Sequence, residues 1–211
     1  MSAVDRLLRV LAKGPKLLRQ RLRDALWQRI LDCPGFSVGA DALIIGDRQM
    51  CLGEGFRAGR MLWLETVSRY GPYMYAPRLI VGRQFSGSDA LHIACAFSVE
   101  IGDDVLVGSK VHITDHNHGL YQGGDGECSP SVPPAIRPLH GAPVRIGNRV
   151  FLADGVVVLP GSDIGDGAIV GANSVVRGRL DPDTIYVGCP ARAVKRHASA
   201  TGTWLRTDCH T

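Results

Sequence analysis

The stretch that decides the fold is VRIGNRVFLADGVVVLPGSDIGDGAIVGANSVVRG, which runs from Val144 to Gly178. Aliphatic residues recur at every sixth position of it: Ile146, Leu152, Val158, Ile164, Val170 and Val176. The position four further along each hexad holds a small or β-branched residue: Val150, Val156, Ser162, Ala168 and Ser174. A period of six is neither the 3.6 residues of an α-helix nor the alternation of a plain strand. It predicts short strands joined by tight turns, with one aliphatic side chain per hexad pointing inward.

The same period continues toward the N-terminus. Ile101, Val107 and Ile113 keep its phase, and a looser set at Val81 and Ile93 precedes them. Glycine follows several of these aliphatic residues, and we expect it to supply turn conformations that other residues resist. A fixed short period predicts a solenoid, in which each coil contacts only its neighbours. The fold class expected from the pattern is therefore an all-β solenoid.

Three segments carry a resemblance to a known family: IGDDVLVGSKVHITDHNHG, GAPVRIGNRVFLADGVVVLPGSDIGDGAIVGANSVV and GCPARAVKR. They resemble the hexapeptide-repeat acyltransferases, in the branch that O-acetylates sugars, which includes maltose and galactoside acetyltransferases and the nodulation, capsule and O-antigen acetyltransferases. The resemblance implies a left-handed parallel β-helix over residues 34–197. It also implies a homotrimer with its sites at subunit interfaces, acting on a saccharide or glycan precursor.

The two ends of the chain follow other patterns. Residues 1–33 carry leucines at helical spacing among many arginines, which predicts a basic amphipathic helical segment. Two interpretations of residues 1–31 stay open: a helix that caps the exposed strands at the solenoid end, or a helix that rests on anionic lipid. The polar tail, residues 198–211, is expected to be a frayed terminus.

Composition narrows the function classes. The net charge of +4 is small and scattered, and no nucleic-acid-binding motif occurs, so we expect no nucleic-acid partner. The chain has 6 cysteines without a CxxC pair, which fits reduced thiols. No apolar run has the length of a membrane span, and arginines interrupt the N-terminal leucines where a signal peptide would be continuously apolar. We therefore expect a cytoplasmic protein, at the inner face of the membrane if the helix binds lipid.

The regular pattern breaks at VHITDHNHGLYQGG, where a long loop over residues 114–143 begins. A loop this long in a compact repeat is typically functional. An imidazole there can accept the proton of a sugar hydroxyl as the hydroxyl attacks a thioester carbonyl. The resemblance places the catalytic histidine five positions after the last inward aliphatic residue, which is His118 counted from Ile113, with His116 as the competitor. Asp115 either orients a ring or caps a turn, and both roles stay open.

The resemblance also implies acetyl-CoA as cosubstrate, bound in a groove between adjacent solenoids, with no metal. Backbone amides at Ala153 and Ala172, with Gly171 beside them, would bind the pantetheine arm, although a simple turn requirement explains the same small residues. The phosphates need cations, and Arg suits them through its planar fork. The candidates follow the last hexads: Arg177, Arg179, Arg192 and Lys195.

Residues for the acceptor are harder to identify. The stretch MLWLETVSRYGPYMYAP concentrates Trp63 and three tyrosines, whose faces suit sugar binding, or else forms an insertion that packs against the helices. Asn117 and Tyr121 of the long loop are further candidates. Phe151 stands where many relatives carry Trp, so a ring for stacking remains but the indole N–H is absent.

Two other functions must be weighed against acetyl transfer. Some hexapeptide-repeat proteins resemble carbonic anhydrases, with zinc held by three histidines, and the ligand types are present here. The histidines in question are His92, His112, His116, His118 and His140. Most of them lie in or beside the irregular segment, and the coenzyme-like C-terminal segment has no role in that interpretation. A non-catalytic β-helix scaffold is the third alternative.

Overall fold

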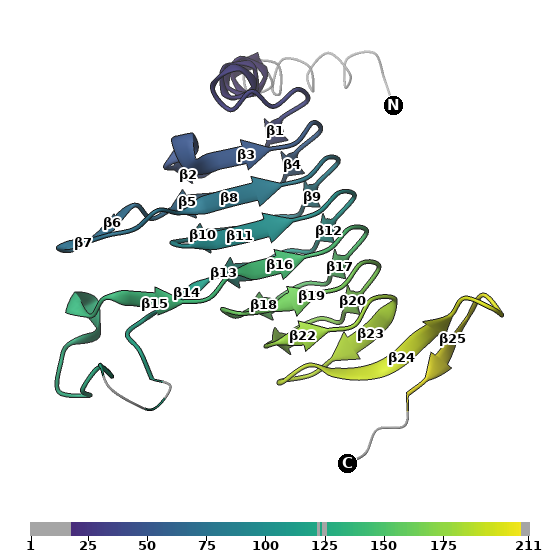
Figure 1. Cartoon of the computed structure of the whole chain (residues 1–211). Helices are drawn as coiled ribbons and strands as arrows, with labels where there is room; N and C mark the ends of the chain where they lie inside the picture. The colour runs from purple at the N-terminus through teal and green to yellow at the C-terminus, as the bar shows by residue number, and fades with distance from the viewer. Residues whose placement is uncertain (1–17, 122, 124–125, 208–211) are drawn as a thin grey trace, which may run out of the picture.

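The computed structural model describes residues 18–121, 123 and 126–207, and over most of them the chain winds into a parallel β-helix (Figure 1). Each coil adds one short strand to each of three sheets in turn. Sheet A contains β1 (Ser37–Val38), β4 (Arg57–Ala58), β9 (Ser86–Gly87), β12 (Leu106–Val107), β17 (Phe151–Leu152), β20 (Ile169–Val170) and β23 (Thr184–Val187). Sheet B contains β2 (Leu43–Ile45), β5 (Trp63–Thr66), β10 (His92–Cys95), β13 (His112–Thr114), β18 (Val157–Val158) and β21 (Val175–Val176). Sheet C contains β3 (Met50–Leu52), β8 (Arg78–Val81), β11 (Ser98–Ile101), β16 (Val144–Ile146), β19 (Asp163–Ile164) and β22 (Arg179–Leu180).

The predicted inward positions form the core. All six aliphatic residues of the deciding stretch are at most 3% exposed, and Ser162 and Ser174 are buried with them. In the first coils, Phe36, Phe56 and Phe85 stack in the interior with ring centroids 5.5 and 4.9 Å apart. The hexad prediction is confirmed, because each coil repeats the same inward set one strand spacing further along.

The expected turn conformation is present at Gly155, Gly161 and Gly167, but it is wrong for the glycines that directly follow the inward aliphatic residues. Gly102 and Gly147 have ordinary negative φ, and the turn residues with positive φ are instead Asp104 and Arg149. A Cβ on Gly102 would lie 2.8 Å from the carbonyl carbon of Gly147 in the next coil. These glycines are required because successive coils approach each other closely at the corner, and not because the turn needs a left-handed residue.

The N-terminal helix covers the first coil, over residues 18–30 (Figure 1). Its polar side chains face the solenoid: Gln28 donates to the carbonyl of Phe36 over 3.1 Å, Gln20 and Arg23 donate to that of Val38, and Asp24 accepts from Ser37. The expected cap on the solenoid end is therefore present, and it combines these polar contacts with Trp27, which packs against the core. The leucine row of the helix faces outward, and its members are 57–64% exposed: Leu18, Leu22, Leu26 and Ile30.

The C-terminal segment is more ordered than the predicted frayed tail. β24 (Arg192–Ala198) pairs antiparallel with β23, and β25 (Thr203–Arg206) pairs antiparallel with β24. His197 and Trp204 meet edge to face across this pair, with ring centroids 5.2 Å apart. Residues 198–207 thus extend sheet A, whereas residues 208–211 lie outside the described part of the chain.

Two insertions leave the solenoid at the same corner, where sheet B passes to sheet C. The first is the aromatic hairpin, β6 (Arg69–Tyr70) with β7 (Tyr73–Met74). The second is the long loop between β13 and β16, whose two ends pair as an antiparallel ribbon of β14 (His116–His118) and β15 (Leu139–Gly141), with a short 3-10 helix at Pro134–Ile136. A second short 3-10 helix at Asp47–Gln49 precedes β3. The intervening coil turns this corner without an insertion, so the hairpin and the loop flank it.

Candidate active site

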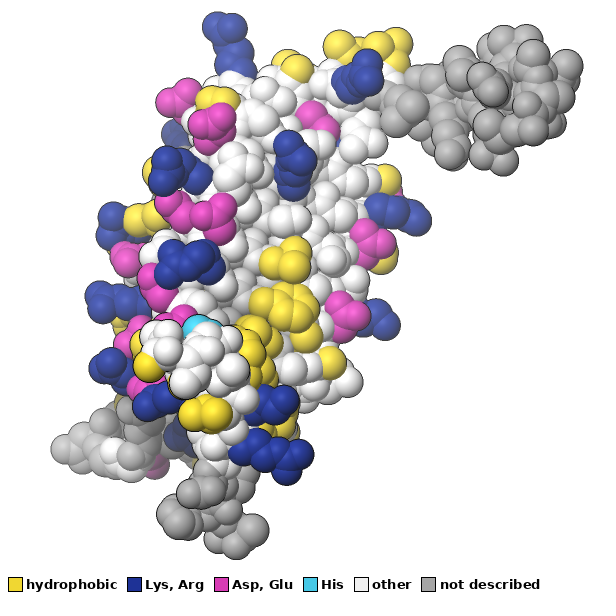
Figure 2. Space-filling model, turned by 90° about the vertical axis from the view of Figure 1, so that its right-hand side faces the viewer, with side chains coloured by type: hydrophobic (Ala, Val, Ile, Leu, Met, Phe, Trp, Pro, Cys, Tyr) yellow, Lys and Arg dark blue, Asp and Glu magenta, His cyan; other side chains and the backbone are white. Residues whose placement is uncertain are grey.

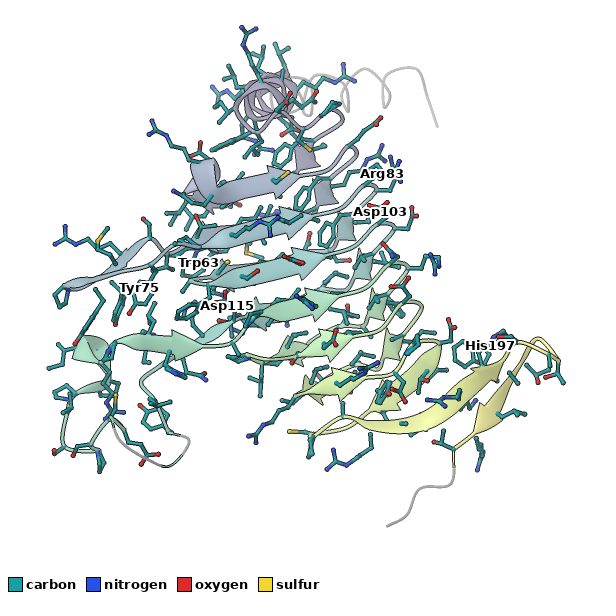
Figure 3. The ribbon with its side chains drawn as sticks, viewed as in Figure 1. Trp63, Tyr75, Arg83, Asp103, Asp115 and His197 are labelled. Atoms are coloured by element: carbon teal, nitrogen blue, oxygen red, sulfur yellow. The ribbon has the colours of Figure 1, made fainter. Side chains whose placement is uncertain are left out.

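Asp115 is the first residue of the long loop and is fully buried. Its two carboxylate oxygens accept hydrogen bonds from the backbone amides of Ala96 and Phe97, at 2.9 and 2.8 Å, where the preceding coil turns the same corner (Figure 3). Oδ1 also lies 2.8 Å from Nδ1 of His116. Burial raises the pKa of Asp115, but the hydrogen bonds from His116 and the two amides outweigh it and hold the pKa below its ordinary value. Asp115 is therefore ionised and both caps the corner and orients a ring.

The orientation of His116 follows from this contact. A carboxylate only accepts, so the proton of the neutral imidazole sits on Nδ1 and leaves Nε2 as the basic atom. The side chain of His116 is 11% exposed, and Thr114 lies 3.4 Å from its Nδ1. His116 thus has an oriented ring but little access from outside in this chain.

His118 has the opposite properties. It lies on the same face of the ribbon as His116, two residues on, and is exposed. Within the described residues, neither of its ring nitrogens has a hydrogen-bond partner, and its ring contact is to Tyr70 of the aromatic hairpin. The two centroids are 5.0 Å apart with an interplanar angle of 65°.

The other face of the ribbon lines a cleft of about 240 Å³. Asn117 and His140 stand directly opposite each other in the ribbon and project into it. Leu159, Pro160 and Arg177 from the following coils form its opposite side. The cleft therefore combines a cation, an imidazole and an amide with an apolar wall, beside the strand that carries His118.

Tyr121 has a structural role in the loop. Its hydroxyl donates to the carbonyl of His118 and accepts from Arg137, whose guanidinium also lies 5.7 Å from the centre of the Tyr121 ring. Arg137 is buried and donates to the carbonyl of Val132 over 2.8 Å. Tyr121 also lines the cleft, so the side chain predicted to contact the substrate takes part in holding the loop as well.

A column of rings runs along the outer surface of sheet B. Trp63, His92 and His112 are in register on three successive coils, with Trp63 stacked on His92 at 4.2 Å and the two Nδ1 atoms of the histidines 3.1 Å apart. Burial lowers the pKa of His92 to about 4, with the charges of His112 and His116 adding to the effect. Burial also lowers the pKa of His112, again with His116 contributing. Both column histidines are therefore neutral at ordinary pH.

The same register bears on the zinc alternative. His92 and His112 do occupy matching positions on neighbouring coils, which sequence spacing did not bring out. Across the residues that the structure describes, however, no group of three or more His, Cys, Asp or Glu side chains is placed to hold a metal ion.

The residues expected to bind the coenzyme lie at the opposite edge of sheet B. Ala153 follows β17 and Gly171–Ala172 follow β20, so they stack at the corner where sheet A passes to sheet B. Phe151 projects outward from sheet A and is 37% exposed. Sheet B separates this corner from the one that carries His118 by about four residues of strand, or roughly 13 Å. One chain therefore does not bring the two sets together.

The predicted cations are also distributed. Arg177 follows β21 and lines the cleft, while Arg179 lies on sheet C opposite Asp163. Arg192 and Lys195 are exposed on β24, at the C-terminal end of sheet A. Arg196 of the same strand is engaged with Asp181 at 2.5 Å. The cations thus occupy two faces of the last coils and do not form one patch in a single chain.

Sequence reasoning missed two features of this site. The first is the meeting of the aromatic hairpin with the long loop, since we expected the hairpin to bind sugar or to pack against the helices. The second is the ring column on sheet B, where His92 was noted only as a ligand type. The recurrence of Trp63, His92 and His112 at the first position of three successive sheet B strands could have indicated it.

Comparisons with known proteins agree with the fold. The family model described as bacterial transferase hexapeptide (six repeats) matches residues 143–178. The chain is 39% identical over 183 residues to WbbJ of Escherichia coli, named as a lipopolysaccharide biosynthesis O-acetyl transferase, covering 87% of this chain and 90% of that one. It is 29% identical over 153 residues to the galactoside O-acetyltransferase of Escherichia coli, covering 70% and 68%.

Among solved structures, a hexapeptide-repeat-containing acetyltransferase from Vibrio cholerae matches with a TM-score of 0.55 at 21% identity, covering 92% of this chain and 93% of that one. This likeness concerns the fold. Together with the extent and identity of the match to WbbJ, these findings show that the chain belongs to the bacterial hexapeptide-repeat transferase family, as an acetyltransferase built on a left-handed parallel β-helix.

Proposed function

We propose that this protein transfers an acetyl group from acetyl-CoA to a hydroxyl of a saccharide, in a surface polysaccharide, capsule or O-antigen precursor, with His118 as general base. The observation that carries the proposal is the exposed imidazole of His118 on β14, a strand whose other face lines the cleft with Asn117, opposite Arg177. The names of the relatives, for lipopolysaccharide and galactoside O-acetyl transfer, support a saccharide acceptor.

The chemistry is a direct transfer. The acceptor oxygen attacks the thioester carbonyl, its proton passes to Nε2 or Nδ1 of His118, and the carbon–sulfur bond breaks as the tetrahedral intermediate collapses. His118 then returns the proton to the departing thiolate. A positioned imidazole suits both steps because its pKa lies near neutral pH.

His118 is preferred to His116 because of access. His116 is oriented by Asp115 but is only 11% exposed, so an acceptor sugar has little approach to its Nε2. His118 is exposed and projects from the ribbon, where a second chain can meet it. The five-residue spacing from Ile113 favours the same choice.

The separation of the two sets of residues supports the homotrimer that the family resemblance implies. Because His118 and the small residues Ala153 and Ala172 lie at opposite edges of sheet B, the complete site needs the loop of one chain against the coenzyme groove of another. Sheet A also exposes Leu106, Phe151 and Val187 at 48, 37 and 42%. Figure 2 shows hydrophobic side chains gathered on this side of the solenoid, where a neighbouring subunit would cover them.

The outward leucine row supports peripheral membrane contact through the N-terminal segment. Leu18, Leu22, Leu26 and Ile30 form one exposed stripe, and Arg19, Arg21 and Arg29 on the same helix are exposed beside it. An apolar stripe flanked by cations fits the surface of an anionic bilayer. In the described part of the chain, no helix has both the length and the apolar character to span a membrane. We place the reaction in the cytoplasm, at the inner face of the membrane, where a lipid-linked acceptor would be met.

The test uses glycan from a strain that lacks the gene. Nuclear magnetic resonance of its surface polysaccharide should show loss of O-acetyl signals. The purified protein should then release free thiol from acetyl-CoA when given that glycan, without added metal and in the presence of EDTA. Chelator-sensitive activity with stoichiometric bound zinc would favour the carbonic-anhydrase-like alternative. Absence of coenzyme A binding in a direct titration would favour a scaffold.

A further inference from the structure

We infer that Tyr70 of the aromatic hairpin is a positioning residue for His118, and that the hairpin is a wall of the active site. The inference rests on the proposed role of His118 as general base. It concerns how an exposed imidazole is held in one orientation.

The contact itself is the first argument. His116 has Asp115 to orient it, whereas within the described residues no hydrogen bond fixes either ring nitrogen of His118. An exposed side chain with free rotamers spends little time in a productive geometry. The edge-to-face contact with Tyr70, at 5.0 Å and 65°, restricts the imidazole plane from one side and leaves its nitrogens open.

The second argument is that Tyr70 is itself held. Its hydroxyl donates to the carbonyl of Ala135 over 2.9 Å, in the outer part of the long loop. Tyr75, which follows the hairpin, accepts the backbone amide of Leu139 over 2.7 Å, and Leu139 is the strand partner of His118. The ring of Tyr75 also meets Phe97 edge to face at 5.6 Å. The hairpin segment is thus fixed to β15, the strand paired with the one that carries His118, and to the short 3-10 helix that precedes it.

The third argument is the shared anchor of the two insertions. The amide of Phe97 binds Asp115, at the point where the long loop leaves the solenoid. Tyr75 packs on the side chain of the same residue, Phe97, from the hairpin side. Both insertions are therefore anchored at one corner of the solenoid. This shared anchor fixes the position of Tyr70 relative to His118.

Two variants separate the ring contact from the hydrogen bond. Tyr70→Phe keeps the ring against His118 and removes the bond to Ala135, so turnover should stay close to that of the wild type. Tyr70→Leu keeps apolar bulk but removes the aromatic edge, so turnover should fall by about tenfold to a hundredfold, as small misplacements of a catalytic group do. The Michaelis constant for acetyl-CoA should not change. Met74→Ala, on the same hairpin and 72% exposed, is the matched control.

A double-mutant cycle with His118→Ala gives the decisive readout, measured as thiol release with glycan from the strain that lacks the gene as acceptor. If Tyr70 acts through His118, Tyr70→Leu should cost nothing further in the His118→Ala background. Circular dichroism and thermal unfolding of each variant report whether the fold is kept. If Tyr70→Leu unfolds, Tyr70→Met, which also removes the aromatic edge and keeps apolar bulk, takes its place in the cycle.

The outcomes are distinguishable. An additive cycle, or equal losses in Tyr70→Phe and Tyr70→Leu, would show that the hairpin only braces the loop and would overturn the positioning role. His118→Ala with full activity would instead overturn the proposed general base. Loss confined to Tyr70→Leu, absent in the His118→Ala background, supports the inference.

Discussion

The carboxylate of Asp115 lies 2.8 Å from Nδ1 of His116, and the neighbouring His118 has its ring against Tyr70 instead. Two histidines that are two residues apart are therefore oriented by different means. His116 is held by the buried carboxylate of Asp115, which also caps a corner of the solenoid. His118 is held by the edge of the Tyr70 ring. This division supports a structural task for His116 and a catalytic one for His118, and replacing each separately tests it.

His118→Ala should lower turnover by about 10²–10⁴-fold, which is the usual contribution of a positioned general base, while acetyl-CoA affinity barely changes. His116→Ala should cost about tenfold, because it removes a second support of the site. Turnover with the same glycan acceptor and a direct acetyl-CoA titration measure both effects. Near-normal turnover of His118→Ala with an inactive His116→Ala would exchange the two roles.

Asp115→Asn should destabilise the fold. The amide offers one acceptor oxygen to two backbone donors and places its NH₂ against the other, so unfolding free energy should fall by about 1–3 kcal/mol. The pH dependence follows from the depressed pKa of Asp115. The contribution is present above the ordinary carboxyl pKa and is lost as pH falls through the lower folded value, so the difference between wild type and variant should shrink below about pH 4. Urea unfolding at pH 7 and pH 3, at fixed protein concentration, measures the stability difference between wild type and variant. A difference that is the same at both pH values would contradict an ionised, stabilising Asp115.

His92→Phe should make the protein less sensitive to mild acid. The folded pKa of His92 is lowered to about 4, so its unfolded form binds a proton first and stability falls as pH drops from about 6.5 toward 4. The loss should be smaller than the roughly 3 kcal/mol that 1.36 kcal/mol per pKa unit gives, because solvent screens the half-buried ring. Phe keeps the stack on Trp63 and cannot titrate, so the acid-dependent loss should diminish in unfolding curves at pH 7 and pH 4.5.

Replacing Arg192 and Lys195 together by Ala should raise the Michaelis constant for acetyl-CoA by about tenfold and change turnover little, since lost phosphate contacts weaken ground state and transition state alike. Arg57→Ala, exposed at the far end of the same sheet, is the control. Initial rates over a range of acetyl-CoA concentrations give both constants. An unaltered Michaelis constant would remove β24 from the coenzyme site.

Leu22→Ser with Leu26→Ser should abolish sedimentation with anionic vesicles and leave the fold unchanged, because both leucines are about 60% exposed and contribute little to the core. The vesicles contain phosphatidylglycerol, and neutral phosphatidylcholine vesicles are the control, to which binding should be weak. The lipid-binding role of the leucine row would be contradicted if the wild-type protein did not bind the anionic vesicles, or if the serine variant bound them equally well. The row would then be a candidate surface for contact with another protein.

The repeat, the solenoid and the inward residues could be predicted from the sequence, as could the place where the pattern breaks. Residues such as Ile146 and Leu152 belong to a short-range pattern that repeats with every strand, so the local period by itself fixes which side chains form the core. The position of His118 relative to Ile113 is local in the same sense. These parts needed no knowledge of distant contacts.

Only the tertiary structure decided which distant segments are in contact at the corners and at the ends of the solenoid. The hairpin of Tyr70 and the loop of His118 are distant in sequence but leave the same corner of the solenoid, and only the stacking of coils brings them together. The N-terminal helix turns Gln20 and Gln28 toward the carbonyls of Val38 and Phe36 at the open edge, which need donors, and it packs Trp27 on the core. The sequence determined the periodic core because inward packing depends on spacing, while the tertiary structure determined the partners of Asp115, His118 and the helix because hydrogen bonds and ring contacts depend on geometry between coils.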